Sequence, residues 1–262
     1  GHHVRDRLLP ALAGVRRVGL RAVCNATGLQ AKVVADKWKA EYCTTDFREI
    51  LADPQIDAVL IGTRHDLHAE LVVASLQAGK DVFVEKPLCL SEEELGRIAE
   101  ASRDAGGTGP HLMVGYNRRF SSHAAKAREF FRQPRGPLVM SYRVNAGMIP
   151  RDHWIHDPLL GGGRLIGEVC HFVDYCQALC GSDPTSVFAR QVGGALTGGQ
   201  DDQLMLSLGF GDGSIASILY TSGGDLSLPK ERVEVIGDGK AVAMDDFLET
   251  TFFAGGSRST FR

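Results

Sequence analysis

The stretch Asp81-Val82-Phe83-Val84-Glu85-Lys86-Pro87-Leu88 decides the fold that the sequence predicts. Its Val-Phe-Val core consists of β-formers and Pro87 ends it, which is typical of a short strand buried on both faces of a parallel sheet. Because open α/β sheets bind ligands at the carboxyl ends of their strands, Lys86 is placed to meet a substrate. A surface ion pair at a strand end would explain an isolated Glu-Lys-Pro better, so the surrounding sequence has to decide.

Strands and helices alternate on both sides of this stretch. Residues 56–62 form another apolar run, and helices are expected over 66–77 and 91–105. Residues 112–114 supply the next strand. The alternation predicts a Rossmann-type parallel sheet over residues 1–118.

Two of the expected helices begin with recognisable caps. Asp46 is followed three residues later by Glu49, and Ser91 is followed three residues later by Glu94. This spacing is that of the capping box, in which the two side chains satisfy backbone N–H groups at a helix start.

The second half of the chain has a different pattern. Residues 204–210 alternate apolar and polar side chains, as in a strand with one buried face. Glycine-rich turns at 211–213 and 237–239 join neighbouring strands into hairpins. We therefore expect an α+β domain with a mostly antiparallel sheet over residues 119–262.

Composition excludes several classes of function. The 262 residues are 44% hydrophobic and carry a formal net charge of −3, which gives no reason to expect nucleic acid or an anionic membrane as a partner. No apolar run reaches the ~18 residues of a membrane span, and no signal-peptide pattern opens the chain, so we expect a cytoplasmic protein. Six scattered cysteines and the pair Glu168 and His171 lack the further ligands of a metal site, and none is expected.

Three motifs in order and spacing resemble the Gfo/Idh/MocA family of NAD(P)-dependent oxidoreductases. They are Ile61-Gly62-Thr63-Arg64-His65-Asp66-Leu67-His68, then Ala78-Gly79-Lys80 running into the opening stretch, then Gly115-Tyr116-Asn117-Arg118-Arg119-Phe120. The resemblance covers nearly the whole chain. It implies NAD or NADP as cofactor and a small-molecule substrate.

A variant signature is similar to the C-terminal part of bi-domain oxidoreductases, in which such a chain follows a zinc alcohol-dehydrogenase-like region. The signature is His153-Trp154-Ile155-His156-Asp157-Pro158 followed by residues 161–172. The resemblance implies that His153, Trp154 and Arg164 line the substrate side. Simple core packing is the competing interpretation for Trp154.

The resemblance also implies a set of cofactor-binding residues. Asn25 stands after the expected strand 18–24, where an NAD enzyme carries a ribose-binding carboxylate. An amide does not repel a 2′-phosphate, so NADP is not excluded. Lys32 lies near enough in sequence to help bind that phosphate. The remaining positions lie in the motifs or at the amino terminus: Gly1, Thr63, His65, His68, Glu85, Lys86, Pro87 and Asn117. For His68, local packing at a helix start is the alternative.

The beginning of the chain predicts an incomplete phosphate site. A dinucleotide-binding domain needs a first strand and a Gly-rich turn before its first helix, and Gly1 lies where the second glycine of that turn would fall. We expect a fragment that lacks the first strand. A divergent start, with His2-His3 left by a tag, is the alternative.

Three residues are the candidates for catalysis. The resemblance implies that Lys86 contacts the reacting oxygen and that His171 exchanges the proton, since a histidine of ordinary pKa, about 6.5, does so near neutrality. Family members carry an aspartate four residues before this histidine, but Gly167 stands there. Glu168, one residue further on, is the nearest carboxylate and is expected to contact His171 or the substrate.

The sequence therefore predicts a dehydrogenase that transfers a hydride between NAD(P) and a polyol, sugar or related hydroxy compound. A homo-oligomer formed through the C-terminal sheet is also expected. The alternative is a catalytically impaired dinucleotide-binding or scaffold domain, active only as part of a longer fused protein.

Overall fold

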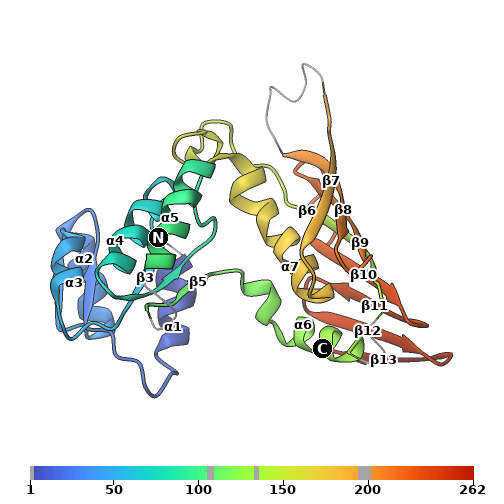
Figure 1. The fold of residues 1–262 in the computed structure, drawn as a ribbon, viewed down its shortest axis with the longest axis horizontal. Coiled ribbons are helices and arrows are strands. Elements are labelled where there is room, and N and C mark those ends of the chain that lie inside the picture. Colours follow the sequence, from blue (N-terminus) through green and yellow to red (C-terminus); the bar gives the residue numbers. More distant parts are fainter. Residues whose placement is uncertain (1–2, 105–108, 133–135, 194–201) are drawn as a thin grey trace. The chain divides into compact units, whose positions relative to one another are not determined.

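The structure is a computed structural model that describes residues 3–104, 109–132, 136–193 and 202–262 (Figure 1). The chain divides into two compact units, Gly1–Gly115 and Tyr116–Arg262. Each unit is built on its own β-structure, parallel in the first and mostly antiparallel in the second, as the sequence predicts.

The first unit contains two parallel sheets. A pair of strands forms one of them and three strands, in the order β3-β4-β5, form the other. In the part of the chain that the structure describes, no strand joins β1 to β3, so each of these strands leaves one edge open. The strands are β1 (Ala22–Cys24), β2 (Tyr42–Thr44), β3 (Ala58–Ile61), β4 (Asp81–Val84) and β5 (Leu112–Val114).

Helices connect these strands, and both predicted caps are present. The Asp46 carboxylate accepts a hydrogen bond from the backbone N–H of Arg48 at 3.0 Å, and Ser91 Oγ accepts one from Glu94 at 3.2 Å. Glu94 Oε2 in turn accepts from the N–H of Leu90 at 2.8 Å, close to the reciprocal pattern of a capping box. The helices are a π-helical turn (Val4–Leu8), α1 (Leu9–Leu12), α2 (Gly28–Trp38), α3 (Phe47–Ala52), a 3₁₀ turn (His65–Leu67), α4 (His68–Gln77) and α5 (Glu92–Asp104).

The three-stranded sheet carries the core of the first unit. Val84 and Val72 are fully buried, and Val82 is 3% exposed, so β4 is the buried strand that its sequence predicts. Side chains of α4 and α5 complete the cluster, among them Leu76 and Ile98. Burial of these apolar side chains fixes β4, and with it the position of the residues that follow.

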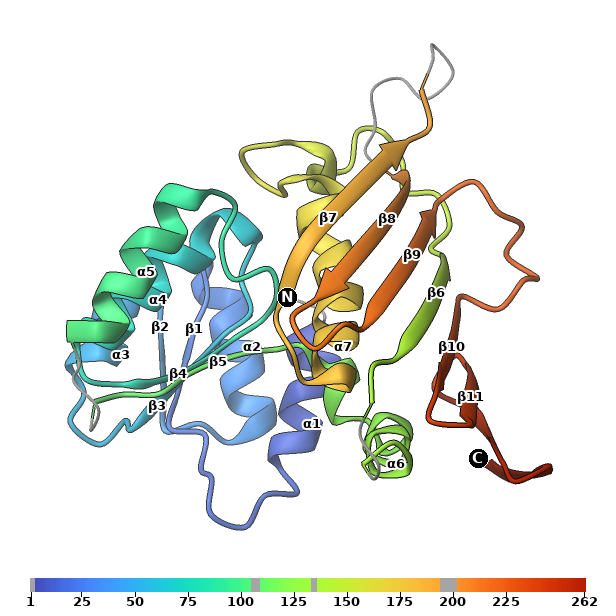
Figure 2. The same ribbon diagram turned by 45° about the vertical axis from the view of Figure 1, so that its right-hand side comes forward.

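The second unit is organised around one eight-stranded sheet in the order β13-β12-β11-β10-β6-β9-β8-β7. Neighbouring strands are antiparallel except for β6 and β9, which run parallel. Figure 2 shows β7, β8, β9 and β6 side by side with α7 behind them. The strands are β6 (Val139–Asn145), β7 (Pro184–Gln191), β8 (Gln203–Phe210), β9 (Ile215–Thr221), β10 (Glu231–Gly237), β11 (Lys240–Asp245), β12 (Glu249–Ala254) and β13 (Ser257–Phe261).

The two predicted hairpins form where the sequence places them. Gly213, between β8 and β9, has a φ of +86°, and Asp238 and Gly239, between β10 and β11, have φ of +52° and +70°. Glycine and aspartate adopt this left-handed region at the lowest steric cost, which explains the turn residues.

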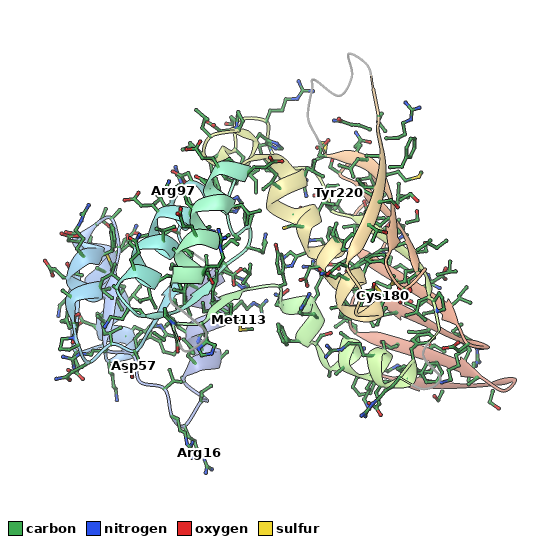
Figure 3. The ribbon with its side chains drawn as sticks, viewed as in Figure 1. Arg16, Asp57, Arg97, Met113, Cys180 and Tyr220 are labelled. Carbon is green, nitrogen blue, oxygen red and sulfur yellow. The ribbon has the colours of Figure 1, made fainter. Side chains whose placement is uncertain are left out.

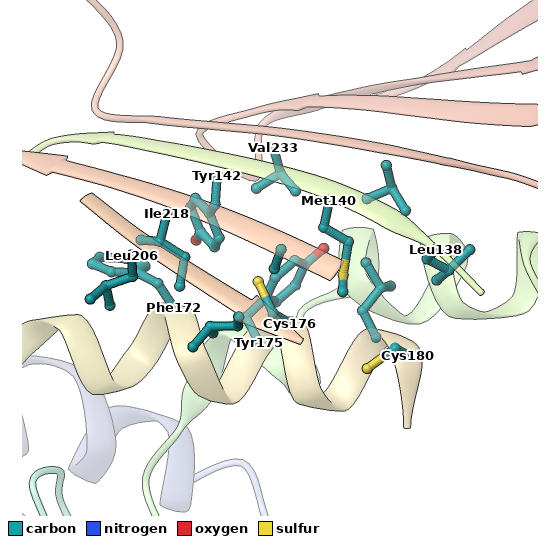
Figure 4. Close-up of a cluster of buried hydrophobic side chains, with 14 of the residues drawn as sticks. Leu138, Met140, Tyr142, Phe172, Tyr175, Cys176, Cys180, Leu206, Ile218 and Val233 are labelled. Carbon is teal, nitrogen blue, oxygen red and sulfur yellow. The ribbon is translucent and has the colours of Figure 1, made fainter. Parts of the chain in front are cut away.

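One face of the sheet packs against α7 (Cys170–Cys180), with α6 (Ser122–Phe130) beside it. Figure 4 shows Phe172, Tyr175 and Cys176 of α7 against side chains of the sheet. The ring of Tyr142 on β6 lies 5.0 Å from that of Phe172 and 5.5 Å from that of Tyr175, both edge-on. Cys176 and Cys180 of this helix are buried in the same cluster.

Several elements depart from the sequence prediction, including β2, β12 and β13, over which no strand was expected. A π-helical turn, Leu165–Val169, directly precedes α7, and no sequence pattern indicated it. Strand β7 was not predicted, because all eight of its residues are exposed and no buried alternation marks it. None of the helices among the described residues is long and apolar enough to span a bilayer.

Candidate active site

The ends of three parallel strands bring the Glu-Lys-Pro segment to one edge of the first unit. Ile61, Val84 and Val114 are register partners across β3, β4 and β5. The backbone N–H of Glu85 donates to Ile61 O at 2.9 Å, and that of Gly115 donates to Val84 O at 2.7 Å. The residues that follow each strand, including Lys86, therefore lie along the same carboxyl edge, where open α/β sheets bind ligands.

Two glycines at this edge allow close packing that a side chain would prevent. A Cβ on Gly62 would lie 2.0 Å from Cγ2 of Val4, so the start of the first helix rests directly on the end of β3. A Cβ on Gly115 would lie 3.0 Å from Glu85 Oε1. A helix start brought against the strand ends is the arrangement that receives the pyrophosphate of a dinucleotide, so this edge fits such a cofactor.

Glu85 lies in a confined position beside this helix start. Its Oε1 is 3.4 Å from Nε2 of His3, and its side chain is 14% exposed. Burial raises the pKa of Glu85, while His3 and Lys86 act in the opposite direction. The Glu85 carboxylate is mostly buried at the carboxyl edge of the sheet. The neighbouring Lys86 ammonium contributes positive charge there.

His68 is completely enclosed behind Pro87. Its side chain has 0% exposure, and Nδ1 lies 2.6 Å from the backbone oxygen of Pro87. Burial lowers the pKa of His68, partly opposed by its hydrogen bonds to the backbone of Pro87 and Thr63. The imidazole is therefore neutral near pH 7, and Nδ1 carries the proton because a carbonyl can only accept.

The other two candidates after β3 differ in exposure. Thr63 is exposed, and its Oγ1 donates to Arg64 O at 3.1 Å, so its side chain can reach a ligand. His65 is 8% exposed, and its ring lies 5.8 Å from that of His68. Cofactor contact by Thr63 and His65 stays a prediction.

The expected ribose site begins at the end of β1. Asn25 Oδ1 accepts a weak hydrogen bond from the N–H of Thr27 at 3.3 Å, which leaves its amide N–H₂ as a donor. Lys32 lies 2.8 Å from Asp36, in an exposed ion pair within α2. Gly1 lies outside the described residues, and Asn117 is exposed at the start of the second unit.

His171 lies on the first turn of α7 in the second unit. It is 5% exposed, and the ring of Tyr116 meets it edge-on at a centroid distance of 5.9 Å. The π-helical turn ends directly before α7, and such turns occur frequently at functional sites. Tyr116 was not singled out by sequence reasoning, although it lies in the third family motif.

Glu168 belongs to an ion-pair network. Its Oε2 accepts hydrogen bonds from Arg164, at 2.7 Å from Nη2, and from the Tyr220 hydroxyl, while Oε1 accepts from Lys230 at 3.1 Å. Tyr220, labelled in Figure 3, reaches it from β9. Burial alone would raise the pKa of Glu168, but Lys230, Tyr220 and Arg164 outweigh it and hold the pKa at about 2. The carboxylate therefore stays ionised near neutrality, and a catalytic role for Glu168 stays a prediction.

The expected substrate residues are divided between the surface and the interior. Arg164 is 1% exposed, donates to Gly147 O at 2.6 Å and stacks over the Tyr220 ring at 5.3 Å. His153 is exposed, with its ring 5.6 Å from that of the half-buried Trp154. The exposed His153 can touch a ligand, whereas the position of Arg164 favours an anchoring role.

Two further ion pairs of the second unit, one to α7 and one to β10, were missed from the sequence. Arg119 binds the Asp174 carboxylate in two-pronged fashion, with distances of 2.9 and 2.6 Å. Arg118 binds Glu231 in the same way, and Tyr142 donates to Glu231 as well. The adjacent arginines of the third motif were the only signal, because their partners lie far away in the sequence.

Comparison with known protein families gives a match for each unit. Residues 1–116 match a family model described as an oxidoreductase family with an NAD-binding Rossmann fold. Residues 130–242 match a model described as the GFO/IDH/MocA C-terminal domain.

Curated proteins and solved structures agree with these matches. The chain is 27% identical to myo-inositol 2-dehydrogenase of Thermotoga maritima, over 95% of this chain and 71% of that protein, and 29% identical to inositol 2-dehydrogenase of Rhizobium meliloti, over 90% and 71%. Its fold is similar to that of an aldose-aldose oxidoreductase from Caulobacter crescentus in complex with glycerol. That structure has a TM-score of 0.86 at 22% identity, covering 100% of this chain and 81% of the other.

Proposed function

Because the chain belongs to the Gfo/Idh/MocA family of NAD-dependent oxidoreductases, we propose that it transfers a hydride between NAD and a hydroxyl carbon of a cyclic polyol or sugar. The observation that carries the proposal is the common edge formed by the ends of β3, β4 and β5, with Lys86 on it. Relatives named as inositol dehydrogenases support the substrate class.

The residues of the first unit that would hold the cofactor lie along this edge. Asn25 would contact the adenosine ribose, the helix start near Val4 would face the pyrophosphate, and Thr63 and Glu85 would flank the nicotinamide half. The nicotinamide ring supplies the hydride chemistry when it is bound. The amide of Asn25 does not repel a 2′-phosphate as a carboxylate would, so NADP is tolerated at this position.

Lys86 supplies positive charge at the reacting oxygen. Removing hydride from an alcohol carbon leaves electron density on its oxygen, and an ammonium group within hydrogen-bond distance stabilises that charge. The buried strand β4 holds the lysine, so the charge is positioned before the substrate arrives.

His171 takes the hydroxyl proton during oxidation and returns it during reduction. An imidazole exchanges protons near neutral pH, which an amine or a carboxylate of ordinary pKa does less well. Glu168 anchors the π-helical turn before it through Arg164, Tyr220 and Lys230, and direct contact of Glu168 with His171 or the substrate is not required. Trp154 and His153 bind the sugar ring from the loop before this turn.

A panel of hydroxy compounds tests the proposed function. Purified protein would be titrated with NADH and NADPH by fluorescence, then assayed for NAD reduction with inositols, aldoses, anhydrosugars and simple secondary alcohols. We expect turnover with at least one cyclic polyol or sugar and none with the simple alcohols. Binding of NADH without turnover on any member would favour the alternative of an impaired dinucleotide-binding domain. The reason would be Gly167, which stands where family members carry an aspartate.

We propose further that the chain pairs with a second copy through the open face of its eight-stranded sheet, opposite α7. Val139, Ile215 and Ile236 are cross-strand neighbours there, with 53%, 52% and 57% exposure, and Leu219 pairs with Met205 nearby. A broad apolar face of this kind is typical of a self-complementary two-fold interface.

Light scattering tests this pairing. Ile215→Asp should convert a dimer to a monomer, whereas Leu29→Asp, at an equally apolar but 78% exposed position on α2, should leave the mass unchanged. A monomeric wild-type protein would contradict the pairing.

We place the enzyme in the cytoplasm, where a pool of NAD is available.

A further inference from the structure

One buried contact in the first unit that the proposed function leaves unexplained joins His68 to the backbone of Pro87. Nδ1 lies 2.6 Å from Pro87 O, slightly shorter than the usual range of about 2.7–3.2 Å for N–H···O hydrogen bonds. The residues are 19 positions apart, so the bond joins the first turn of α4 to the segment after β4. Nothing in the proposed chemistry so far uses it.

His68 lies inside the first unit, and its contact with the cofactor stays a prediction. Its side chain has 0% exposure, and it is among the largest fully buried side chains of the protein. A buried polar ring costs stability unless it is hydrogen-bonded. The bond from His68 to Pro87 O therefore has a structural consequence at Pro87. What it holds is the carbonyl of the residue directly after Lys86.

We propose that His68 is a positioning residue that fixes Lys86 at the reacting oxygen by holding the Pro87 carbonyl. Strand β4 fixes the backbone before Lys86 through the bond from Glu85 N to Ile61 O at 2.9 Å. His68 fixes it on the other side. Lys86 therefore lies between two hydrogen bonds of the neighbouring backbone, one at Glu85 and one at Pro87. These bonds fix the position of its Cα, from which the side chain extends to the amine.

The state of the imidazole agrees with this role. Burial lowers the pKa of His68, so the ring is neutral and one nitrogen carries the proton. Because Pro87 O only accepts, that nitrogen is Nδ1. The bond therefore persists through the neutral pH range, and His68 takes no part in proton transfer.

Side-chain shape provides a matched pair of variants. In His68→Asn the amide nitrogen occupies the place of Nδ1 and can donate to Pro87 O. In His68→Leu a side chain of similar size has no donor. Ser75→Ala is the control for damage to α4, since Ser75 is 2% exposed and donates to Leu71 O at 2.7 Å within the same helix.

The inference rests on the proposed function for its kinetic readout, so a second readout is independent of activity. We expect His68→Leu to lower kcat by about 10²-fold, the loss that a ~1 Å misplacement of a catalytic group can cause, with the Kd for NADH little changed. The rate at which an amine reagent labels Lys86, measured against exposed Lys32 by mass spectrometry, should rise several-fold. His68→Asn should restore both values, and Ser75→Ala should alter neither.

A double-mutant cycle separates action through Lys86 from general damage. In a Lys86→Ala background, His68→Leu should cost almost nothing further in kcat. An equal loss in both backgrounds, or a His68→Asn variant as impaired as His68→Leu, would overturn the proposal. If His68→Leu does not fold, His68→Gln replaces it, because its longer amide reaches past the place of Nδ1. A wild-type protein without turnover would refute the proposed function, while unchanged labelling of Lys86 in the variants would refute the role of His68.

Discussion

The Glu168 carboxylate and the Arg164 guanidinium form a nearly enclosed ion pair, with Oε2 2.7 Å from Nη2 and side-chain exposures of 17% and 2%. Arg164 directly precedes the π-helical stretch before α7, and Glu168 lies within it, four residues further on. Tyr220 and Lys230 complete the coordination of the carboxylate from the sheet. The network ties the helix that carries His171 to β9 and to the start of β10.

The first prediction concerns the stability of this network. Glu168 has a pKa of about 2 against an ordinary value of 4.5, so it contributes on the order of 3 kcal/mol to folding above pH 4.5, which is lost as the pH falls toward 2. Glu168→Gln leaves the buried Arg164 without its charge partner, so the melting temperature at pH 7 should fall by several degrees. The variant should also lose less stability than the wild type between pH 4.5 and 2. Parallel pH profiles for the two proteins would contradict this account.

The second prediction concerns the pH dependence of activity. Oxidation of the substrate should rise with pH through one inflection, because His171 must be neutral to accept a proton. The inflection should be abolished in His171→Ala and unmoved in Glu168→Gln, since the charge of Glu168 is already matched by Arg164 and Lys230. An inflection that moves downward in Glu168→Gln would show that Glu168 acts on the histidine directly.

The third prediction follows from the open edges of β1 and β3. Strand edges with unpaired backbone groups are unfavourable inside a domain, and one further parallel strand between them would pair both. Extending the chain at its amino terminus by about 10 residues of strand and Gly-rich turn should raise the melting temperature and the affinity for NADH together. Micromolar binding of NADH by the 262-residue chain, unimproved by the extension, would contradict this.

Local sequence was sufficient to predict elements whose residue types depend on neighbours close in the chain, such as buried strands, helix caps and tight turns. Val82 and Val84 reveal a buried strand, Asp46 and Ser91 cap helices, and Gly213 marks a hairpin, because each feature depends on neighbours within a few residues. Strand β7 gave no signal, since none of its residues is buried.

The site could be predicted only in its composition. The motifs pointed to Lys86 and His171 as site residues. No pattern showed that Arg164 is buried. Nor could spacing show that Lys230 and Tyr220 reach Glu168, because they lie 62 and 52 residues away from it. Long-range pairs of this kind follow from the packed sheet and cannot be read from spacing along the chain.

The central claim is that Lys86 serves hydride transfer at the edge formed by β3, β4 and β5, and steady-state reduction of NAD by Lys86→Ala tests it most directly. With the best hydroxy substrate from the panel, kcat should fall by about 10²–10³-fold, the usual cost of removing a group that stabilises a developing oxyanion, while the Kd for NADH changes only a few-fold. Turnover by Lys86→Ala equal to that of the wild type would remove Lys86 from the site and contradict the account.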